Sequence, residues 1–275
     1  MTTDPPVGPR TARSGDRSAN LSDGLSGGAR APRLVTLHVW RVPTRRVPAA
    51  VARMGWDRLG LARVPGLQFA KLLGTGRGAT FTPGADTRRW GLVASWHDAG
   101  AVAAFEASSL VRGWGRLAEE SWRAELVPLG ARGRWARRAP FGRPEPRDWD
   151  GPIAVLTRAR LTLRQIRRFW RAVPPVTADV NGRDGLLAAF GFGEAPWVWQ
   201  GTFSMWRDAA AVRAFAYQGA AHRAAIQATE ETGWYAEELF ARFGVSRASG
   251  TLDDEDPFAR LPAGPSSNPT TGPGS

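Results

Sequence analysis

The sequence predicts an α+β fold of two tandem ferredoxin-like βαββαβ repeats, which together form a dimeric α/β-barrel-like structure. Three observations support this prediction. The 275 residues are enough for two ordinary domains, two segments of the chain resemble each other, and both segments present strands and helices in the same order. One ferredoxin-like unit leaves one face of its sheet uncovered, and two units can close that face into a shared barrel.

The resemblance between the two segments rests on three short matches that occur in the same order. The longest aligns Trp96-His-Asp98-Ala-Gly-Ala-Val102 with Trp206-Arg-Asp208-Ala-Ala-Ala-Val212, at an offset of 110 residues. The other two align Leu73-Gly74-Thr-Gly76 with Phe190-Gly191-Phe-Gly193, and Trp122-Arg-Ala124-Glu125 with Trp234-Tyr-Ala236-Glu237. Together these matches indicate an internal duplication.

Each segment begins with an apolar strand and then alternates helices with strands. In the first segment we expect strands at 34–42, 67–73, 89–96 and 124–129 and a helix at 48–61; in the second, strands at 153–161, 186–190, 198–206 and 243–248 and a helix at 163–173. A second helix is expected after Asp98 and after Asp208, because a carboxylate at the N-cap accepts hydrogen bonds from free amides. We interpret the Gly-x-Gly pair at 74–76 as a turn, since it opens no helix as a dinucleotide-binding loop would.

Composition divides the chain into five parts. Residues 1–32 and 251–275 are rich in Gly, Ser and Pro, which predicts disordered tails. Residues 33–130 form the first repeat and 151–250 the second. Residues 131–150 are rich in Arg and Pro and lack periodicity, which is typical of a linker.

Residue usage excludes several kinds of chemistry. Cysteine is absent, so disulfides, iron–sulfur clusters, thiolate-ligated haem and cysteine-based zinc sites are excluded. The chain has three histidines, which leaves room for a haem with a single axial ligand. The net charge of +12 is spread along the chain, which disfavours a nucleic-acid partner. The sequence has no apolar run of membrane-spanning length and no signal-peptide core, so we expect a cytoplasmic protein with at most transient membrane-surface contact.

His222 is the strongest candidate for a cofactor ligand. On a helix over 220–231, His222, Ile226 and Thr229 would share one face. Small residues surround that face, so a flat group could approach closely (Ala220, Ala221, Ala224 and Ala225). One interpretation is an axial haem ligand, and the alternative is a half-buried histidine with satisfied hydrogen bonds. The first segment offers Leu110 or Val111 at this place, so one site per chain would follow.

The other polar candidates have weaker patterns. His38 shares one side of its strand with Thr36 and Trp40, and it could be a catalytic distal group inside the barrel or an ordinary core histidine. His97 lies at a strand–helix corner and should face solvent. The glutamates Glu230, Glu231, Glu237 and Glu238 are expected to form the polar face of a helix rather than a carboxylate pair.

One arginine-rich helix face has two interpretations. Arg164, Arg167, Arg168 and Arg171 lie opposite apolar residues of the helix at 163–173. They are either a solvated face or a docking surface for an acidic electron donor. The 13 Trp residues suit a large apolar pocket, and they are equally good core residues.

Several motifs of the second half resemble the spheroidene monooxygenase (acyclic carotenoid 2-ketolase) family. They are Arg168-Phe169-Trp170-Arg171, Gly191-Phe-Gly-Glu-Ala-Pro-Trp197, Thr202-Phe-Ser-Met-Trp-Arg-Asp208 and His222-x-x-Ala-Ile226 followed by Trp234-Tyr-x-Glu-Glu-Leu-Phe240. The first half adds Phe69-Ala-Lys71-Leu-Leu-Gly-Thr-Gly76 followed by Phe81-Thr-Pro83. The resemblance covers about residues 34–248 and is strongest in the last hundred.

The resemblance implies a haem-containing monooxygenase that hydroxylates one carbon of a long polyene twice and leaves a ketone. It implies dioxygen and reduced ferredoxin as co-substrates and favours His222, with Ile226 beside it, as the haem ligand. Candidate walls for an apolar substrate are Phe69, Trp197 and Trp199. Lys71 could anchor a haem propionate or orient bound oxygen, and a structural salt bridge is the alternative.

Two other classes of function stay open. The same fold could support another haem reaction, such as peroxidation, dehydration or haem breakdown. A non-catalytic barrel that carries haem or an apolar ligand is also compatible with the sequence. A Soret band in protein produced with ample haem would support the haem classes.

Overall fold

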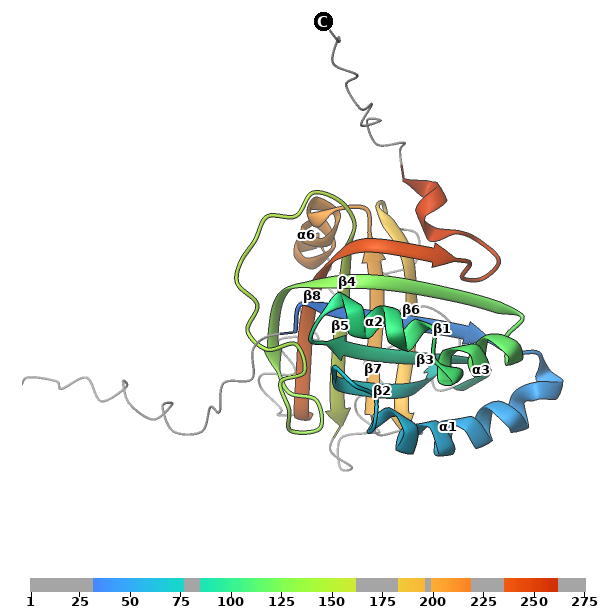
Figure 1. The fold of residues 1–275 in the computed structure, drawn as a ribbon. Helices are drawn as coiled ribbons and strands as arrows, with labels where there is room; N and C mark the ends of the chain where they lie inside the picture. Colours follow the sequence, from blue (N-terminus) through green and yellow to red (C-terminus); the bar gives the residue numbers. More distant parts are fainter. Residues whose placement is uncertain (1–31, 77–84, 162–182, 196–198, 219–234, 262–275) are drawn as a thin grey trace, which may run out of the picture. The chain divides into compact units, whose positions relative to one another are not determined.

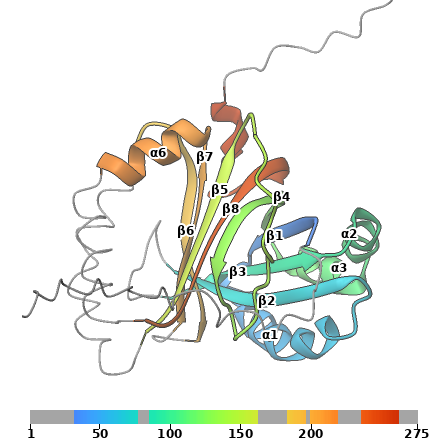
Figure 2. The ribbon, with the colours of Figure 1, turned by 90° about the vertical axis from the view of Figure 1, so that its left-hand side faces the viewer.

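Eight antiparallel strands close into a barrel in the order β1-β3-β2-β6-β7-β5-β8-β4 (Figures 1 and 2). The computed structural model describes residues 32–76, 85–161, 183–195, 199–218 and 235–261. All strands come from one chain, so the barrel closes without a second subunit. The chain is therefore an α+β protein built on an eight-stranded antiparallel barrel.

The two halves of the chain contribute four strands each, in the same spatial order. The first half supplies β1 (Leu34–Arg41), β2 (Leu67–Gly76), β3 (Ala85–Trp96) and β4 (Glu120–Gly133), arranged as β4-β1-β3-β2. The second half supplies β5 (Ile153–Leu161), β6 (Leu186–Ala195), β7 (Trp199–Trp206) and β8 (Tyr235–Gly250), arranged as β8-β5-β7-β6. The two halves therefore have the same strand order within one closed barrel. The segment of the second half expected to form the helix at 163–173 lies outside the described residues.

Two seams of unequal length join the halves. The β4–β8 seam is long and runs from Trp122 opposite Gly250 to Gly133 opposite Leu239. In the described residues, the β2–β6 seam has only two pairs, Gly74 with Gly193 and Thr75 with Phe192. The glycines expected in turns thus lie inside strands, because pairing between the halves extends both strands past them.

Helices cover the outer face of the first half. The connection between β1 and β2 forms α1 (Val47–Leu61) after a short 3-10 helix, η1 (Thr44–Arg46). The connection between β3 and β4 forms α2 (Ala99–Glu106) and α3 (Ser109–Leu117), and both are visible beside β3 in Figure 2. In the second half, α6 (Ala209–Gln218) follows β7.

Both predicted N-caps are confirmed. Asp98 accepts a hydrogen bond from the Ala101 amide at 2.8 Å, and Asp208 accepts one from the Ala211 amide at 2.8 Å. Each carboxylate satisfies an amide that the first helical turn leaves without a partner.

Apolar residues form two separate cores. In β1, Val35, Leu37 and Val39 face the barrel interior and pack with apolar residues of both halves. The alternate residue Trp40 faces the other way, into a second core between the first sheet and α1–α3. The barrel interior is therefore filled by side chains, as in other small barrels.

The region expected to be a linker is packed against the barrel. The strand β4 extends to Gly133, and a hairpin follows in which Trp135 pairs with Arg138. Trp135 and Phe141 are fully buried in the barrel core. Part of the expected C-terminal tail is also ordered, since Leu252 pairs with Glu255 and a 3-10 helix, η2 (Pro257–Arg260), follows.

The helix expected around Glu237 and Glu238 is wrong. Both residues lie in β8, and Glu120 and Glu125 lie in β4. The reason is the β4–β8 seam, in which both strands run far beyond the apolar stretches that predicted them. Long-range pairing of this kind leaves little signal in local sequence.

Candidate functional site

Four of the predicted site residues cannot be placed by the described part of the chain. His222, Ile226 and Trp197 lie outside the described residues. Trp199 is the first residue of β7, but its side chain is likewise not described. The structure does place Lys71, Phe69 and His38, and it brings the first two together at one end of the barrel.

Lys71 and Phe69 point to the inner side of β2. Lys71 Nζ lies 2.8 Å from Glu194 Oε2 and 6.0 Å from the centre of the Phe69 ring. Phe69 packs edge-on against Trp135, whose indole Nε1 donates a hydrogen bond to Glu194 Oε1 at 2.5 Å. This position favours the salt-bridge interpretation of Lys71.

Arg158 extends this cluster across the barrel end. It is 3% exposed, and its guanidinium contacts Glu194 at 3.3 Å and also pairs with Glu237. Its Cζ lies 5.6 Å from the centre of the Trp135 ring. The cluster therefore balances the buried Arg158 and the partly exposed Lys71 with two carboxylates, and burial of charged groups requires such pairing.

Glu237 connects the cluster to the hairpin that follows β4. Its carboxylate accepts hydrogen bonds from the amides of Ala136 and Arg137 at 3.1 and 2.6 Å. Both of these residues have positive φ, so the carboxylate stabilises an uncommon turn. Burial by itself would raise the pKa of Glu237, but these amides and Arg158 stabilise the charged form, and its pKa is lower than usual.

A surface depression of about 590 Å³ opens beside this cluster. It lies where β2 has separated from β6, and it is lined by residues from α1, β2, the hairpin and β6, including Arg58, Leu61, Phe69, Lys71, Arg138 and Glu194. Its lining is about equally polar and apolar, and it includes three cations, Arg58, Lys71 and Arg138. The apolar part, which includes Phe69, offers a contact surface for an apolar ligand at the mouth of the filled barrel.

His38 does not face the barrel interior. It stacks on Trp40 at 5.2 Å and meets Phe105 edge-on, so it belongs to the core beneath α2. Its Nε2 lies 2.9 Å from Glu106 Oε1, and that carboxylate also accepts a hydrogen bond from Arg123. The distal-group hypothesis is therefore wrong in its geometry, because the alternation of β1 directs His38 toward the helices.

Neither described histidine is placed to hold a metal. His97 is exposed at the corner between β3 and α2, as expected, and His38 is engaged with Glu106. Among the residues that the structure describes, no group of three or more potential ligands lies together. The third histidine, His222, lies outside the described residues.

The outer faces of the two halves differ in side-chain size. Facing its helices, the first half carries large side chains: His38, Trp40, Leu72 and Leu92. At the matching register positions the second half carries small ones: Thr157, Ala159, Gly191 and Thr202. Their chain neighbours Leu156, Phe192 and Phe203 pack inside the barrel. Because successive side chains of a strand point to opposite faces, these small residues lie on the outer face.

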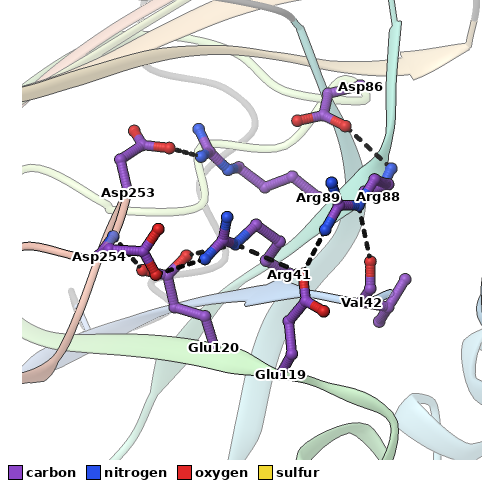
Figure 3. Close-up of polar contacts among 9 residues, drawn as sticks. All are labelled: Arg41, Val42, Asp86, Arg88, Arg89, Glu119, Glu120, Asp253 and Asp254. Atoms are coloured by element: carbon purple, nitrogen blue, oxygen red, sulfur yellow. Dashed lines mark hydrogen bonds and ion pairs between the residues drawn. The ribbon is translucent and has the colours of Figure 1, made fainter. Parts of the chain in front are cut away.

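The hairpin after β8 is the counterpart of the hairpin after β4, and it carries two aspartates where the other carries Ala136 and Arg137. Figure 3 shows these aspartates with their partners. Asp253 and Asp254 have positive φ, and Glu120 accepts a hydrogen bond from the Asp254 amide at 2.6 Å. Asp253 pairs with Arg89, and Arg41 donates to Asp254 at 2.6 Å. Burial lowers the pKa of Arg41, but the carboxylates around it have the larger combined effect and raise it.

Sequence reasoning missed Arg158, Glu194, Glu237 and Trp135 as members of one cluster. Arg158 gave one signal in the sequence, because Arg158 and Arg160 interrupt a strand of otherwise apolar or small residues. Glu194 and Trp135 gave no signal in the sequence, since the contact between them depends on the pairing of β2 with β6 and on the hairpin after β4.

The comparison with solved structures defines the class of fold. A structure of aldoxime dehydratase matches over 79% of this chain and 84% of its own, with a TM-score of 0.55 and 13% sequence identity. A second one, aldoxime dehydratase in complex with butyraldoxime, gives a TM-score of 0.54 at 9% identity, over 78% and 80% of the two chains. At such identities the likeness establishes a shared α+β barrel architecture.

The comparison with curated proteins identifies the family. Spheroidene monooxygenase from Rhodobacter capsulatus is 35% identical over 222 residues, which cover 78% of this chain and 91% of that protein. The Cereibacter sphaeroides protein of the same name is 34% identical over 81% of this chain and 70% of its own. The Rubrivivax gelatinosus protein is 39% identical over 65% and 69%. No family model matches the chain. The chain belongs to the spheroidene monooxygenase family and is an oxidoreductase.

Proposed function

We propose that this protein is a haem-dependent monooxygenase that oxidises an acyclic carotenoid or a similar apolar polyene. Dioxygen is the oxidant and reduced ferredoxin supplies the electrons. The observation that carries the proposal is the identity of 34–39% to relatives named spheroidene monooxygenase. The absence of Cys and the single candidate ligand, His222, agree with a histidine-ligated haem.

The reaction consists of two hydroxylations at one carbon. In each, dioxygen, two electrons and two protons convert a C–H bond to C–OH, and the second oxygen atom leaves as water. The second hydroxylation gives a geminal diol, which loses water to form a ketone. When bound, haem supplies the activation of dioxygen. The protein must bind the polyene, orient one carbon and exclude water.

The small outer face of the second half supports a haem site there. A planar group needs a flat surface, and Thr157, Ala159, Gly191 and Thr202 leave room where the first half has bulky residues. His222 belongs to the connection between β7 and β8. In the first half the corresponding connection forms α2 and α3, which cover the outer face of their sheet. We therefore place the haem between the small face and the segment that carries His222 and Ile226.

This placement assigns Lys71 no role in haem binding. Lys71 lies on the inner side of β2, whereas the small face is on the outer side of the second half. Phe69 keeps its expected role as an apolar wall, because it lines the depression at the barrel mouth. Trp197 and Trp199 stay candidate walls, and the arginines of the 162–182 segment stay a candidate dock for ferredoxin.

We also infer that the two halves arose by duplication of one ferredoxin-like unit. Gly66 and Gly185 have φ of +73° and +80°, and a Cβ on them would meet Ala101 and Ala211 respectively. Both glycines accept a hydrogen bond from the residue that follows the last Trp of a strand, His97 or Arg207. The same glycine conformation and the same backbone hydrogen bond thus occur in both halves, which supports a common origin.

The haem ligand is tested by comparing two histidine variants. The wild-type protein, produced with ample haem, should show a Soret band. His222→Ala should lose the band or bind haem much more weakly, because the sequence has no second histidine between β7 and β8. His97→Ala is the matched control and should keep the band, since His97 is exposed at a corner. Equal haem retention in both variants would overturn the assignment.

A further inference from the structure

We propose that the outward face of α1 docks on the surface of an anionic lipid bilayer. This inference goes beyond the reaction proposed above, since it concerns where the protein is held and not what it oxidises. It rests on an unusual concentration of exposed apolar side chains on one helix.

The described residues include four large apolar side chains that are strongly exposed, and three of them lie on α1. Val51 is 54% exposed, Trp56 81% and Leu59 72%. The fourth, Phe240 in β8, is 38% exposed. Single exposed apolar residues are common on protein surfaces, but a cluster marks an interaction site.

The exposed residues share one side of the helix. At 100° per residue, Val51 and Trp56 lie on either side of Leu59. The other exposed residues on the same side of the helix, between Val51 and Trp56 in helical projection, are small or apolar: Pro48, Ala52, Gly55 and Ala62. The opposite side, with Ala50 and Leu61, packs on the sheet. The helix is therefore apolar on both sides, and such helices are normally covered by protein or lipid.

The charges that border this face are all positive. Arg45, Arg58 and Arg63 are exposed at its edges. The only acidic residue between 44 and 63, Asp57, faces inward and pairs with Arg53 at 3.1 Å. An apolar face with Trp and Leu between arginines is typical of helices that lie in the interface of an anionic membrane.

Other occupants of the face fit less well. Residues 1–31 contain few large apolar residues, so this segment offers little to cover Trp56 and Leu59. Figure 1 shows α1 at the edge of the first half, with no described element over its outer side. No helix in the described ranges is long and apolar enough to cross a bilayer, and α1 would lie in the membrane surface.

The docked position has a consequence for the depression at the barrel mouth. Arg58, Leu61 and Ala62, at the end of α1, form part of its lining. Docking through α1 would therefore bring the depression to the lipid surface. For the carotenoid substrate proposed above, which dissolves in membranes, this gives a route that avoids water; only this step rests on the proposed function.

Vesicle sedimentation tests the proposal on the full chain without substrate. Wild-type protein should sediment with vesicles of phosphatidylcholine and phosphatidylglycerol, and less with phosphatidylcholine alone. The double variant Trp56→Ser/Leu59→Ser should reduce binding at least about tenfold, because it removes the apolar anchor. Arg45→Glu/Arg63→Glu should abolish the preference for anionic vesicles. Circular dichroism should show both variants folded, since all four side chains are exposed.

Two matched controls change similar residues elsewhere. Phe240→Ser removes an exposed aromatic from β8, and Arg213→Glu/Arg247→Glu reverses two exposed arginines on α6 and β8. Both should bind vesicles like the wild type. Wild-type protein that stays in the supernatant, or α1 variants that bind as well as the controls, would overturn the proposal. So would a wild-type dimer that Trp56→Ser/Leu59→Ser converts to a monomer, because the face would then bind a second copy. None of these outcomes affects the haem spectrum, which tests the proposed function separately.

Discussion

At the scale of single residues, Glu237 holds three distant parts of the chain together. It lies in β8, pairs with Arg158 of β5 and accepts amide hydrogens from the hairpin that follows β4. Its partner Arg158 is almost fully buried. A buried guanidinium that loses its carboxylate is costly, so this one side chain should matter for stability.

We predict that Glu237→Gln lowers the free energy of unfolding by about 2 kcal/mol at neutral pH. The pKa of Glu237 is lower in the folded protein than in the unfolded chain. Its contribution is therefore present above the unfolded value, about 4.3, and is lost as the pH falls through the folded value. Urea titrations of both proteins between neutral and acid pH should show the difference shrinking below about pH 4.5. A difference that stays constant with pH would contradict this role.

Lys71 provides a second test at this scale. It pairs with Glu194 on the inner side of β2, away from the proposed haem face. Lys71→Met should therefore lower stability by about 1 kcal/mol and leave the Soret band unchanged. Thermal unfolding and the absorption spectrum check the two parts. A shifted or missing Soret band in a folded variant would restore Lys71 as a cofactor residue.

At the scale of elements, the hairpin after β4 closes one end of the barrel. Trp135 at its base is fully buried and contacts Phe69, Phe192 and Arg158. The Arg- and Pro-rich composition of this segment predicted a linker, and the composition alone conceals that its Trp and Phe enter the core.

Trp135→Ala should therefore destabilise the protein by about 3–5 kcal/mol, as large-to-small core substitutions do. Trp56→Ala is the matched control on α1. It should change stability by no more than about 0.5 kcal/mol, because Trp56 is 81% exposed. Chemical denaturation of the two variants measures both values. Similar stabilities would mean that the hairpin does not contribute to the core.

The sequence predicted those helices and strands that are marked by apolar periodicity or by a capping residue within the element itself. The strand that became β1, the helix that became α1 and both aspartate N-caps follow from apolar periodicity and capping chemistry. The ends of β4 and β8 and the pairing at Gly74 could not be predicted, because contacts between the two halves determine them. The cluster of Lys71, Glu194 and Arg158 was missed for the same reason.

At the scale of the whole molecule, two halves with the same strand order differ in what covers them. The first half fills the space beneath its helices with His38, Trp40 and Leu92. The second half presents small residues at the matching positions. The sequence matches between the halves predicted the common strand order. They did not predict this asymmetry, because the face of each residue depends on strand register, which a single sequence leaves open.

The most direct test of the central claim follows the oxygen atom. Protein loaded with haem, supplied with a ferredoxin system and an acyclic carotenoid, should form an alcohol before a ketone. With isotope-labelled dioxygen, mass spectrometry should find the label in the alcohol; the ketone exchanges its oxygen with water, so the alcohol is the informative species. A label that enters the alcohol from water, or turnover that persists without iron, would contradict the monooxygenase mechanism.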